Sequence, residues 1–321
     1  MPRSTDIQQE NTHRKLFSTF GAARTILGGT DTQGYWGFEF DDFASKFQNL
    51  LCERIGNPLD VPWQKDVYFK PDDYIELATA IDSLDFTSDP AGHIDEPLAL
   101  EFAKRSNIFG INGPIGSGKD SVAEALAPYG FVRLSFSDPL RIAGALTYGI
   151  PLRYFLDRSL KDLPLPNSPM SPRRVIQLLG TEVVRAIHDR IWVKRNLLRM
   201  ASAMHDLSGY SKNSPERLSV TNGIKAIVPD VRFQNEADFV RFVDGRVVKL
   251  SRPTTGVVTP SVNTAVNHSS ELGVSDSSSD IHLVNIGSLT DFHAESAKVL
   301  LAAIEPKLPK QNSRLSARRK P

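Results

Sequence analysis

The chain has 321 residues, 40% of them hydrophobic and 23% charged, which is an ordinary composition for a globular protein with a buried core. Its 38 Lys and Arg residues nearly balance 37 Asp and Glu residues, so no overall field favours nucleic acid or an anionic membrane as the main partner. A single cysteine excludes an intramolecular disulfide, and no apolar run is long enough to cross a bilayer. We therefore expect a cytoplasmic protein without a secretory signal, a membrane contact or direct nucleic acid binding.

The first zone of the chain, residues 1–106, predicts a mainly helical N-terminal extension, partly disordered and of unknown role. Its opening third is polar and rich in Gly and Thr, which is typical of loosely ordered chain. Apolar residues at helical spacing then predict a helix over residues 41–55, and a proline near a first turn predicts another from Pro71. Pro90 and Pro97 are typical of a linker at the end of the zone.

The second zone, residues 107–305, alternates strand and helix patterns. Short apolar runs predict strands, which we place at residues 107–112, 131–136, 224–228, 246–250 and 280–286. Helical patterns follow them, at residues 121–127, 139–148, 171–189 and 291–304. This alternation predicts an α/β fold with three layers, in which a parallel sheet carries helices on both faces.

Three further segments are predicted to lie outside the regular core. Residues 206–223 have the composition of a polar loop, and residues 254–280 form a longer segment rich in Ser, Thr and Val. A loop of that length inside a compact domain is usually a functional lid or disordered chain. The last residues, 306–321, predict a short basic tail that is flexible.

The most informative stretch is Gly113-Pro-Ile-Gly-Ser-Gly-Lys-Asp-Ser121. It has the G-x-x-x-x-G-K spacing of a phosphate-binding P-loop, between an apolar strand and a helix. Glycines let successive N–H groups turn towards a phosphate, and the start of the helix adds its positive dipole end. Lys119 adds a full charge directed at the β- and γ-phosphates. The sequence therefore predicts a nucleoside triphosphate site made by Gly113, Gly116, Ser117, Gly118, Lys119, Asp120 and Ser121.

The residue after the lysine departs from the strict pattern, which requires Ser or Thr to bind Mg²⁺. Asp120 stands there, and Ser121 comes one residue later. Three interpretations stay open. Ser121 reaches the metal one residue late, Asp120 holds a metal-bound water, or Asp120 only favours the positive helix start.

Three polar clusters elsewhere predict a second anion site. Asp138 to Arg141 follow the second strand and place a carboxylate and a cation at the carboxyl edge of the sheet, where α/β proteins bind ligands. Arg173 and its neighbour begin the helix predicted at residues 171–189, and guanidinium forks match phosphate oxygens. Asp230 ends an inner strand, which is a usual place for a Mg²⁺-water ligand, and Arg232 beside it suits a phosphate.

Two residues near the second cluster add to this hypothesis. A glycine in mid-helix costs about 1 kcal/mol relative to alanine, so Gly180 predicts a close approach of another group. Trp192 follows the predicted helix and is either a core tryptophan or a surface on which a base stacks.

Taken together and in this order, the motifs resemble those of the bacteriophage deoxynucleoside monophosphate kinases, a family of P-loop nucleotide kinases. The resemblance covers roughly residues 107–301 and rests on GSGKDS (116–121), DPLR (138–141), PRRVIQLLGTE (172–182), IWV (191–193), PDVRFQNEAD (229–238), SRP (251–253) and HSSE (268–271). The lysine-aspartate pair of the loop is usual in this family. The N-terminal extension lies outside the resemblance, and oligomerisation, covering of the site and partner binding are all open as its role.

The resemblance implies transfer of the γ-phosphoryl group of ATP to a deoxynucleoside 5′-monophosphate (dNMP), with Mg²⁺ as cofactor. The oligomeric state is not readable from the sequence, and a homodimer stays open. It implies a dNMP site made by Leu140, Arg141, Arg173, Gly180, Thr181, Trp192, Asp230, Arg232 and Glu236. The catalytic set is Lys119, Arg173, Asp230 and Arg232, and the metal would meet Ser121 directly and Asp230 through water. Arg252, His268 and Glu271 belong to the lid side. A phage origin would place the protein in the host cytoplasm.

Two other functions stay open at this stage. A P-loop kinase can act on another phosphorylated acceptor, such as dephospho-coenzyme A, and a P-loop protein can be a nucleotide-dependent switch with no acceptor at all. The paired arginines and Trp192 favour a nucleotide acceptor over both.

Overall fold

The computed structural model describes residues 19–27, 40–55, 71–84, 96–166, 168–206, 223–253, 274 and 280–304. Five parallel strands form one sheet in the order β2-β3-β1-β4-β5. They are β1 (Asn107–Asn112), β2 (Phe131–Arg133), β3 (Lys225–Val228), β4 (Arg246–Ser251) and β5 (Ile281–Val284). Strand β1 is central, and its residues from Ile108 to Asn112 are all buried.

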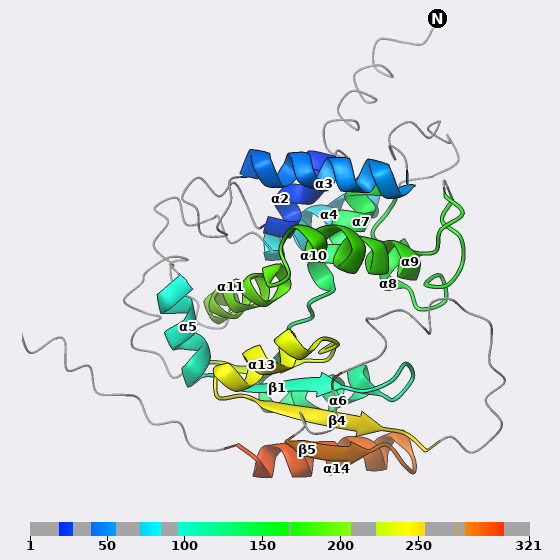
Figure 1. The fold of residues 1–321 in the computed structure, drawn as a ribbon. Helices are drawn as coiled ribbons and strands as arrows, with labels where there is room; N and C mark the ends of the chain where they lie inside the picture. Colours follow the sequence, from blue (N-terminus) through cyan, green and yellow to red (C-terminus); the bar gives the residue numbers. More distant parts are fainter. Residues whose placement is uncertain are drawn as a thin grey trace, which may run out of the picture.

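Alternating side chains of the strands feed two separate cores. Phe109 and Ile111 of β1 point to the face covered by α6 (Lys119–Leu126) and α14 (Leu289–Ala302). Ile108 points to the other face, where α13 (Gln234–Phe242) packs on β1 and β4. Beyond α13 lie α11 (Ile191–Asp206) and α5 (Glu96–Arg105), which pack on each other. The predicted α/β fold, a parallel sheet between two helical layers, is therefore confirmed (Figure 1).

A second, all-helical half of the molecule lies above the sheet and α13 in Figure 1. It contains α7 (Asp138–Tyr148), α8 (Arg153–Leu156) and a continuous helical run made of α9 (Pro172–Gln177), the π-helix η2 (Leu178–Val183) and α10 (Val184–Ile187). Ser171 caps this run by accepting the N–H of Arg174, with Pro172 at the first position.

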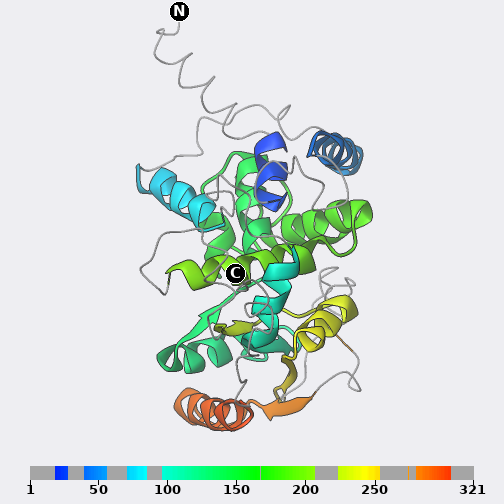
Figure 2. The same cartoon turned by 90° about the vertical axis from the view of Figure 1, so that its left-hand side faces the viewer.

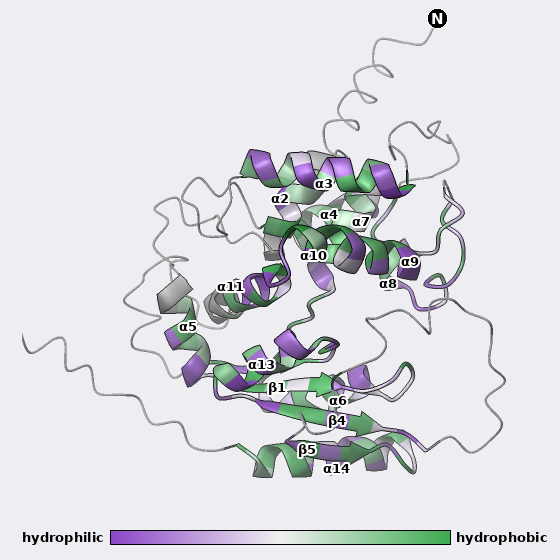
Figure 3. Ribbon diagram, in the orientation of Figure 1, coloured by the Kyte–Doolittle hydropathy of each residue, from purple (hydrophilic) through white to green (hydrophobic). Residues whose placement is uncertain are grey.

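The N-terminal helices belong to this helical half (Figures 1 and 2). They are α2 (Thr19–Leu27), α3 (Phe40–Ile55) and α4 (Pro71–Leu84). Figure 3 shows α3 with alternating hydrophilic and hydrophobic colours, as expected for a helix with one buried face. Its buried side is formed by Phe43, Phe47 and Leu51, which join the same hydrophobic core as α7 and η2.

Most predicted elements are found, with some differences. The strand expected at 131–136 ends at Arg133, and the strand at 280–286 covers only Ile281–Val284. The opening third of the extension, predicted to be loosely ordered, contains α2, and the linker predicted at Pro97 is the first turn of α5. Tertiary packing explains α2, because its buried residues Ala22, Ala23 and Ile26 lie against α7.

Several predicted segments fall outside the described residues. These are residues 207–222 of the polar loop, nearly all of the lid candidate at 254–280, and the basic tail at 306–321. Among the helices that the structure does describe, none is long and apolar enough to cross a membrane.

Candidate active site

The sheet order creates a crevice at the carboxyl ends of β1 and β3. The chain leaves β1 towards β2 through α6 on one face and leaves β3 towards β4 through α13 on the other. Neighbouring strands whose connections diverge in this way form a switch point, where open α/β sheets bind their ligands. The glycine loop follows β1 and Asp230 follows β3, so both predicted sites start at this point.

The glycine loop is shaped by its backbone. Gly116 has φ of 77° and Gly118 has φ of 102°, in the left-handed region that favours glycine, and Gly118 is the N-cap of α6. At Gly113 a Cβ atom would lie 2.5 Å from the carbonyl oxygen of Leu250, so the loop and β4 are in close contact. The side chain of Asn285 donates a hydrogen bond of 2.8 Å to the carbonyl of Ser117.

Lys119, in the first turn of α6, folds back onto this loop. Its ammonium group donates to the carbonyl oxygens of Gly113 at 2.6 Å and Pro114 at 2.8 Å. The positive charge of Lys119 therefore lies beside the glycine loop, close to the positive start of α6. A lysine and a helix start at the same loop are the two features expected of a phosphate-binding loop.

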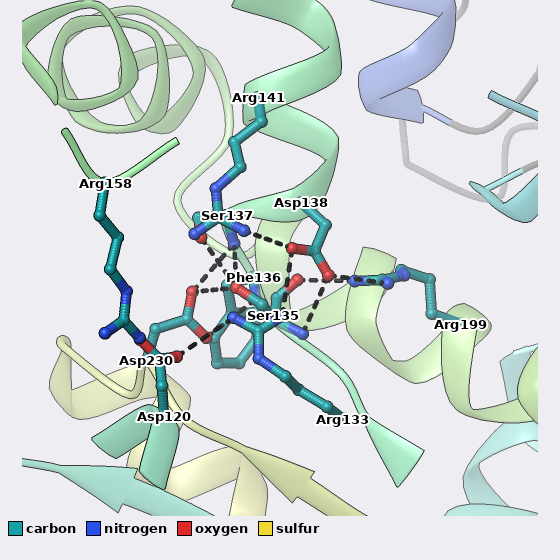
Figure 4. A network of polar contacts seen from close by, with 10 residues as sticks. All are labelled: Asp120, Arg133, Ser135, Phe136, Ser137, Asp138, Arg141, Arg158, Arg199 and Asp230. Atoms are coloured by element: carbon teal, nitrogen blue, oxygen red, sulfur yellow. Dashed lines mark hydrogen bonds and ion pairs between the residues drawn. The ribbon is translucent and has the colours of Figure 1, made fainter. Parts of the chain in front are cut away.

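Asp230 ties the end of β3 to the segment that follows β2 (Figure 4). Its carboxylate accepts hydrogen bonds from the Ser135 hydroxyl at 2.6 Å and from the backbone N–H groups of Phe136 and Ser137 at 3.0 Å each. Burial raises the pKa of Asp230, but the bond from Ser135 and the charges of three nearby arginines outweigh burial and lower the pKa. Asp230 is therefore an ionised strut at neutral pH.

Asp138 organises the cations around the same segment. It pairs with Arg141 at 2.7 Å and with Arg199 of α11 at 3.1 Å, while Arg133 lies 3.6 Å away (Figure 4). Arg199 also donates to the carbonyl of Ser135 at 2.6 Å. These contacts hold Arg141 at the edge of the sheet next to Asp230.

A cavity of about 500 Å³ lies between the sheet and the helical half. Every residue of the predicted dNMP site lines it, namely Leu140, Arg141, Arg173, Gly180, Thr181, Trp192, Asp230, Arg232 and Glu236. Asp120 of the glycine loop lines it too, so the predicted donor and acceptor sites are adjacent. The predicted residues thus come together from four separate segments of the chain.

Four cations form a cluster in this cavity: Arg141, Arg173, Arg232 and Lys161. Burial lowers the pKa of Lys161, and the positive charges of these three arginines lower it further. Arg173 is also held by a neighbour, because its Nε and Nη2 donate to Asp162 at 2.5 and 3.0 Å. Mutually repelling cations around one cavity are typical of a site that binds an anion.

Sequence analysis missed four cations of this cavity, Lys161, Arg158, Arg133 and Arg185. Lys161 and Arg158 lie in the turn between α8 and α9, and Arg133 ends β2. Arg158 and Arg133 pair with Asp120 at 2.8 and 3.4 Å. The turn has no periodic pattern or motif, and the predicted strand and helix that contain Arg133 and Arg185 give no signal of a ligand contact beyond the charge of these side chains.

Glu236 lines the cavity and also holds the backbone of Arg232 in place. It is 3% exposed, accepts the backbone N–H groups of Arg232 at 2.8 Å and Phe233 at 3.1 Å, and pairs with Arg185. Burial raises the pKa of Glu236 to about 7, against the opposing effect of Arg185. The Arg185 guanidinium also lies 3.9 Å from the centre of the Phe233 ring.

Trp192 and Gly180 form a wall of the cavity. Trp192 is only 3% exposed, and its indole N–H donates to the carbonyl of Gly180 at 2.9 Å. A Cβ atom at Gly180 would lie 2.9 Å from Cδ1 of Leu140, which is the kind of close approach that a mid-helix glycine predicts. The π-helix places this carbonyl, and π-bulges often occur at functional sites.

The lid residues stay predictions. Arg252 is exposed at the end of β4 and does not line the cavity, while His268 and Glu271 lie outside the described residues. Arg174, next to Arg173, pairs with Glu182 and does not line the cavity either.

Magnesium would find few protein ligands here. Within the described ranges, no group of three or more His, Cys, Asp or Glu side chains is arranged to hold a metal ion. Mg²⁺ in phosphoryl-transfer sites usually keeps several waters and binds substrate phosphates plus one or two protein groups, so the predicted donor set of Ser121 and, through water, Asp230 would fit such an ion.

Fold and site together define an α/β protein of the kind expected for a P-loop kinase. Residues 157–295 match the family model for deoxynucleotide monophosphate kinase. A protein of Acanthamoeba polyphaga mimivirus, named "Putative deoxynucleotide monophosphate kinase", is 28% identical over 194 residues, which cover 59% of this chain and 93% of that protein. These matches confirm the resemblance: residues 157–295 are similar to the deoxynucleotide monophosphate kinase family.

The matched region defines which predictions the family supports. Residues 157–295 contain the helical run from α9 to α10, α11 and the β3–α13 segment, but not the glycine loop. A kinase family implies a phosphotransferase that uses ATP, usually with Mg²⁺, and a deoxynucleotide acceptor. The relative comes from a giant virus, and a phage origin stays a prediction.

Proposed function

We propose that this protein transfers the γ-phosphoryl group of ATP to a deoxynucleoside 5′-monophosphate, giving the diphosphate and ADP. The observation that carries the proposal is the cluster of Lys161, Arg141, Arg173 and Arg232 in a cavity next to the glycine loop. A switch protein needs the loop but not a second cationic site beside it. The family match supports the same acceptor class.

The residues divide between donor and acceptor. The loop from Gly113 to Ser121 and Lys119 would hold the ATP phosphates, since its glycines and the start of α6 present N–H groups and positive charge. The four-cation cluster would hold the phosphate of the acceptor, with the apolar wall around Phe155, Ile176 and Trp192 left for the sugar and base.

The chemistry needs positioning and charge more than proton transfer. An oxygen of the acceptor phosphate, already anionic at neutral pH, attacks the γ-phosphorus, and the bond to the β,γ-bridging oxygen breaks to release ADP. Lys119, Arg173 and Arg232 would neutralise the charge of the transferred group and hold the two nucleotides in line. Mg²⁺, bound near Ser121 and through water to Asp230, would supply charge neutralisation on the donor phosphates.

The decisive test is ATP consumption with a panel of acceptors. We expect ADP formation only when a deoxynucleoside monophosphate is added, with matched ribonucleotides and dephospho-coenzyme A as comparison acceptors. ATP hydrolysis that needs no acceptor would point to a switch protein and contradict the proposal. Turnover with dephospho-coenzyme A alone would also contradict it and keep only the kinase class.

A further inference from the structure

The N-terminal helices pack on the two helices that form the acceptor half of the cavity. Ala22, Ala23 and Ile26 of α2 are fully buried against α7, which carries Leu140 and Arg141. Helix α3 contacts η2, the segment of Gly180 and Thr181. These segments share one hydrophobic core, so the extension is part of the structure around the cavity.

Helix α4 makes the most specific of these contacts. Asp73 in its first turn is 6% exposed and forms an ion pair with Arg153 of α8. Burying a carboxylate costs free energy unless it is paired with a cation. The pair of Asp73 and Arg153 therefore fixes how α4 and α8 lie against each other. Phe155 and Leu156 follow two and three residues after Arg153 in α8, and both line the acceptor cavity.

A second cavity shows that α4 also reaches the cation side of the site. It has a volume of about 410 Å³ and is lined by Glu76, Thr79, Ala80, Asp138, Arg141, Ile142, Leu152, Leu156 and Arg199. Arg141 and Leu156 line both cavities, so one wall separates α4 from the acceptor site. The turn after α8 continues to Lys161, whose carbonyl accepts the N–H of Arg173 at 3.1 Å.

We propose that Asp73 is a positioning residue for the acceptor nucleotide, acting through Arg153 and α8 on the wall formed by Phe155 and Leu156. The extension is then a working part of the acceptor site and leaves the glycine loop untouched. This inference rests on the proposed function, because it assumes that the cavity holds the acceptor. Small displacements of a wall far from the reacting atoms are enough to change substrate use strongly.

The test compares two carboxylates of the same extension. Asp73→Asn removes the buried charge, and Asp42→Asn removes an exposed carboxylate that pairs with Lys46 at 2.8 Å on α3. We expect Asp73→Asn to raise the KM for the dNMP about tenfold with little change in the KM for ATP. Asp42→Asn should leave both constants at the wild-type values.

A double-mutant cycle separates positioning from general damage. Arg153→Gln should raise the dNMP KM as Asp73→Asn does, and the double variant should be no worse than either single one, since the pair acts as a unit. If Asp73→Asn fails to fold, Arg153→Lys, which keeps the charge, is compared with Arg153→Gln in the same assay, and the dNMP KM of the lysine variant should lie closer to wild type.

Two results would overturn the inference. One is an unchanged dNMP KM in folded Asp73→Asn or Arg153→Gln protein. The other is an equal rise of both KM values, which would mean loosening of the whole fold. The wild-type assay keeps the two proposals apart, because a wild type that phosphorylates no dNMP contradicts the proposed function itself, whatever the variants do.

Discussion

The donor loop and the acceptor cavity are built in different ways, although they share one edge of the sheet. The loop is a single stretch, Gly113 to Ser121, whose shape comes from positive φ angles and from contact with β4. The cavity is assembled from side chains of segments far apart in sequence, and its charges hold one another through Asp162, Asp138 and Asp230. The loop, whose shape depends on its backbone, should tolerate few substitutions. In the cavity, which is made of side chains, each single substitution should lower activity only in part.

The largest effect should come from Lys119, the one side chain through which the loop adds a full charge. Lys119→Ala should lower kcat by roughly 10²–10³, the usual cost of one contact to the developing charge. Stability should change little, because the hydrogen bonds of Lys119 to Gly113 and Pro114 lie partly at the surface. A coupled assay of ADP release measures the rate, and thermal unfolding measures the stability.

Lys298→Ala is the matched control, since Lys298 is 78% exposed on α14 on the outer side of the sheet. It should behave as wild type in both measurements. Near-wild-type turnover by Lys119→Ala would show that the lysine is not needed for phosphoryl transfer. It would also contradict the proposed difference between the loop and the cavity.

The cavity is tested by two neighbouring arginines. Arg173→Ala should lower kcat/KM for the dNMP about ten- to hundredfold, because one of four clustered cations is lost. The KM for ATP should stay close to wild type. Arg174→Ala, which breaks a pair with Glu182 outside the cavity, should leave dNMP use unchanged. Equal effects of the two variants would contradict the assignment of Arg173.

Asp230 should show that one carboxylate supports both the fold and the cavity. Asp230→Ala leaves the Ser135 hydroxyl and two backbone N–H groups without their acceptor, which costs about 3 kcal/mol of the free energy of unfolding. The pKa of Asp230 is lowered in the folded state. Its contribution to stability is therefore present above the pKa of the unfolded state and is lost as pH falls from there through the lower pKa of the folded state. Denaturant unfolding at neutral and acid pH should therefore show the gap between wild type and variant closing in acid. The exposed Asp238→Ala is the control, and a gap that stays constant would contradict this role.

Elements of both halves were predictable where their signals are local. Strand β1 is the apolar run 107–112, and the run that begins at α9 has a serine cap followed by a proline. Two of the helices that sequence analysis missed, α11 and α13, have charged or polar residues on their buried faces. Both helices have apolar residues at helical spacing, but α11 also buries Arg195 and Asn196, at 2% and 1% exposure, and α13 buries Glu236, side chains that a sequence pattern assigns to the exposed face.

The same reasoning separates the predicted from the missed residues of the site. Motif residues such as Arg173 and Arg232 were found because they stand next to a helix start or a strand end. Lys161 and Arg158 lie in the turn after α8. The position of this turn depends on the pairs that Asp162 forms with Arg173 and that Arg158 forms with Asp120. Only the tertiary fold brings such residues to the cavity, and single-sequence patterns do not contain that information.

Glu236, which lines the cavity, should make the stability of the protein depend on pH. Its pKa is raised by burial to about 7 from 4.5, so the folded state binds the proton more tightly than the unfolded state. Its contribution to stability is fully present below pH 4.5 and is lost as pH rises through about 7. Glu236→Gln should remove this slope, seen as a melting temperature that falls less between pH 5 and about 8. Glu295→Gln, exposed on α14, should keep the wild-type slope, and an unchanged slope in Glu236→Gln would contradict the prediction.

The smallest effect should come from Arg158, which bridges the two regions. Its side chain is 78% exposed and pairs with Asp120 of the loop helix, while lining the acceptor cavity. Exposed ion pairs contribute little to stability and are screened by salt, so Arg158→Ala should keep the wild-type melting temperature. As a screened charge at the mouth of both sites, Arg158 should affect the KM values of ATP and dNMP together, by about two- to fivefold at low salt and less at high salt. A change confined to the dNMP, independent of salt, would instead make Arg158 a direct ligand of the acceptor phosphate and would move the boundary between the two regions to the turn after α8.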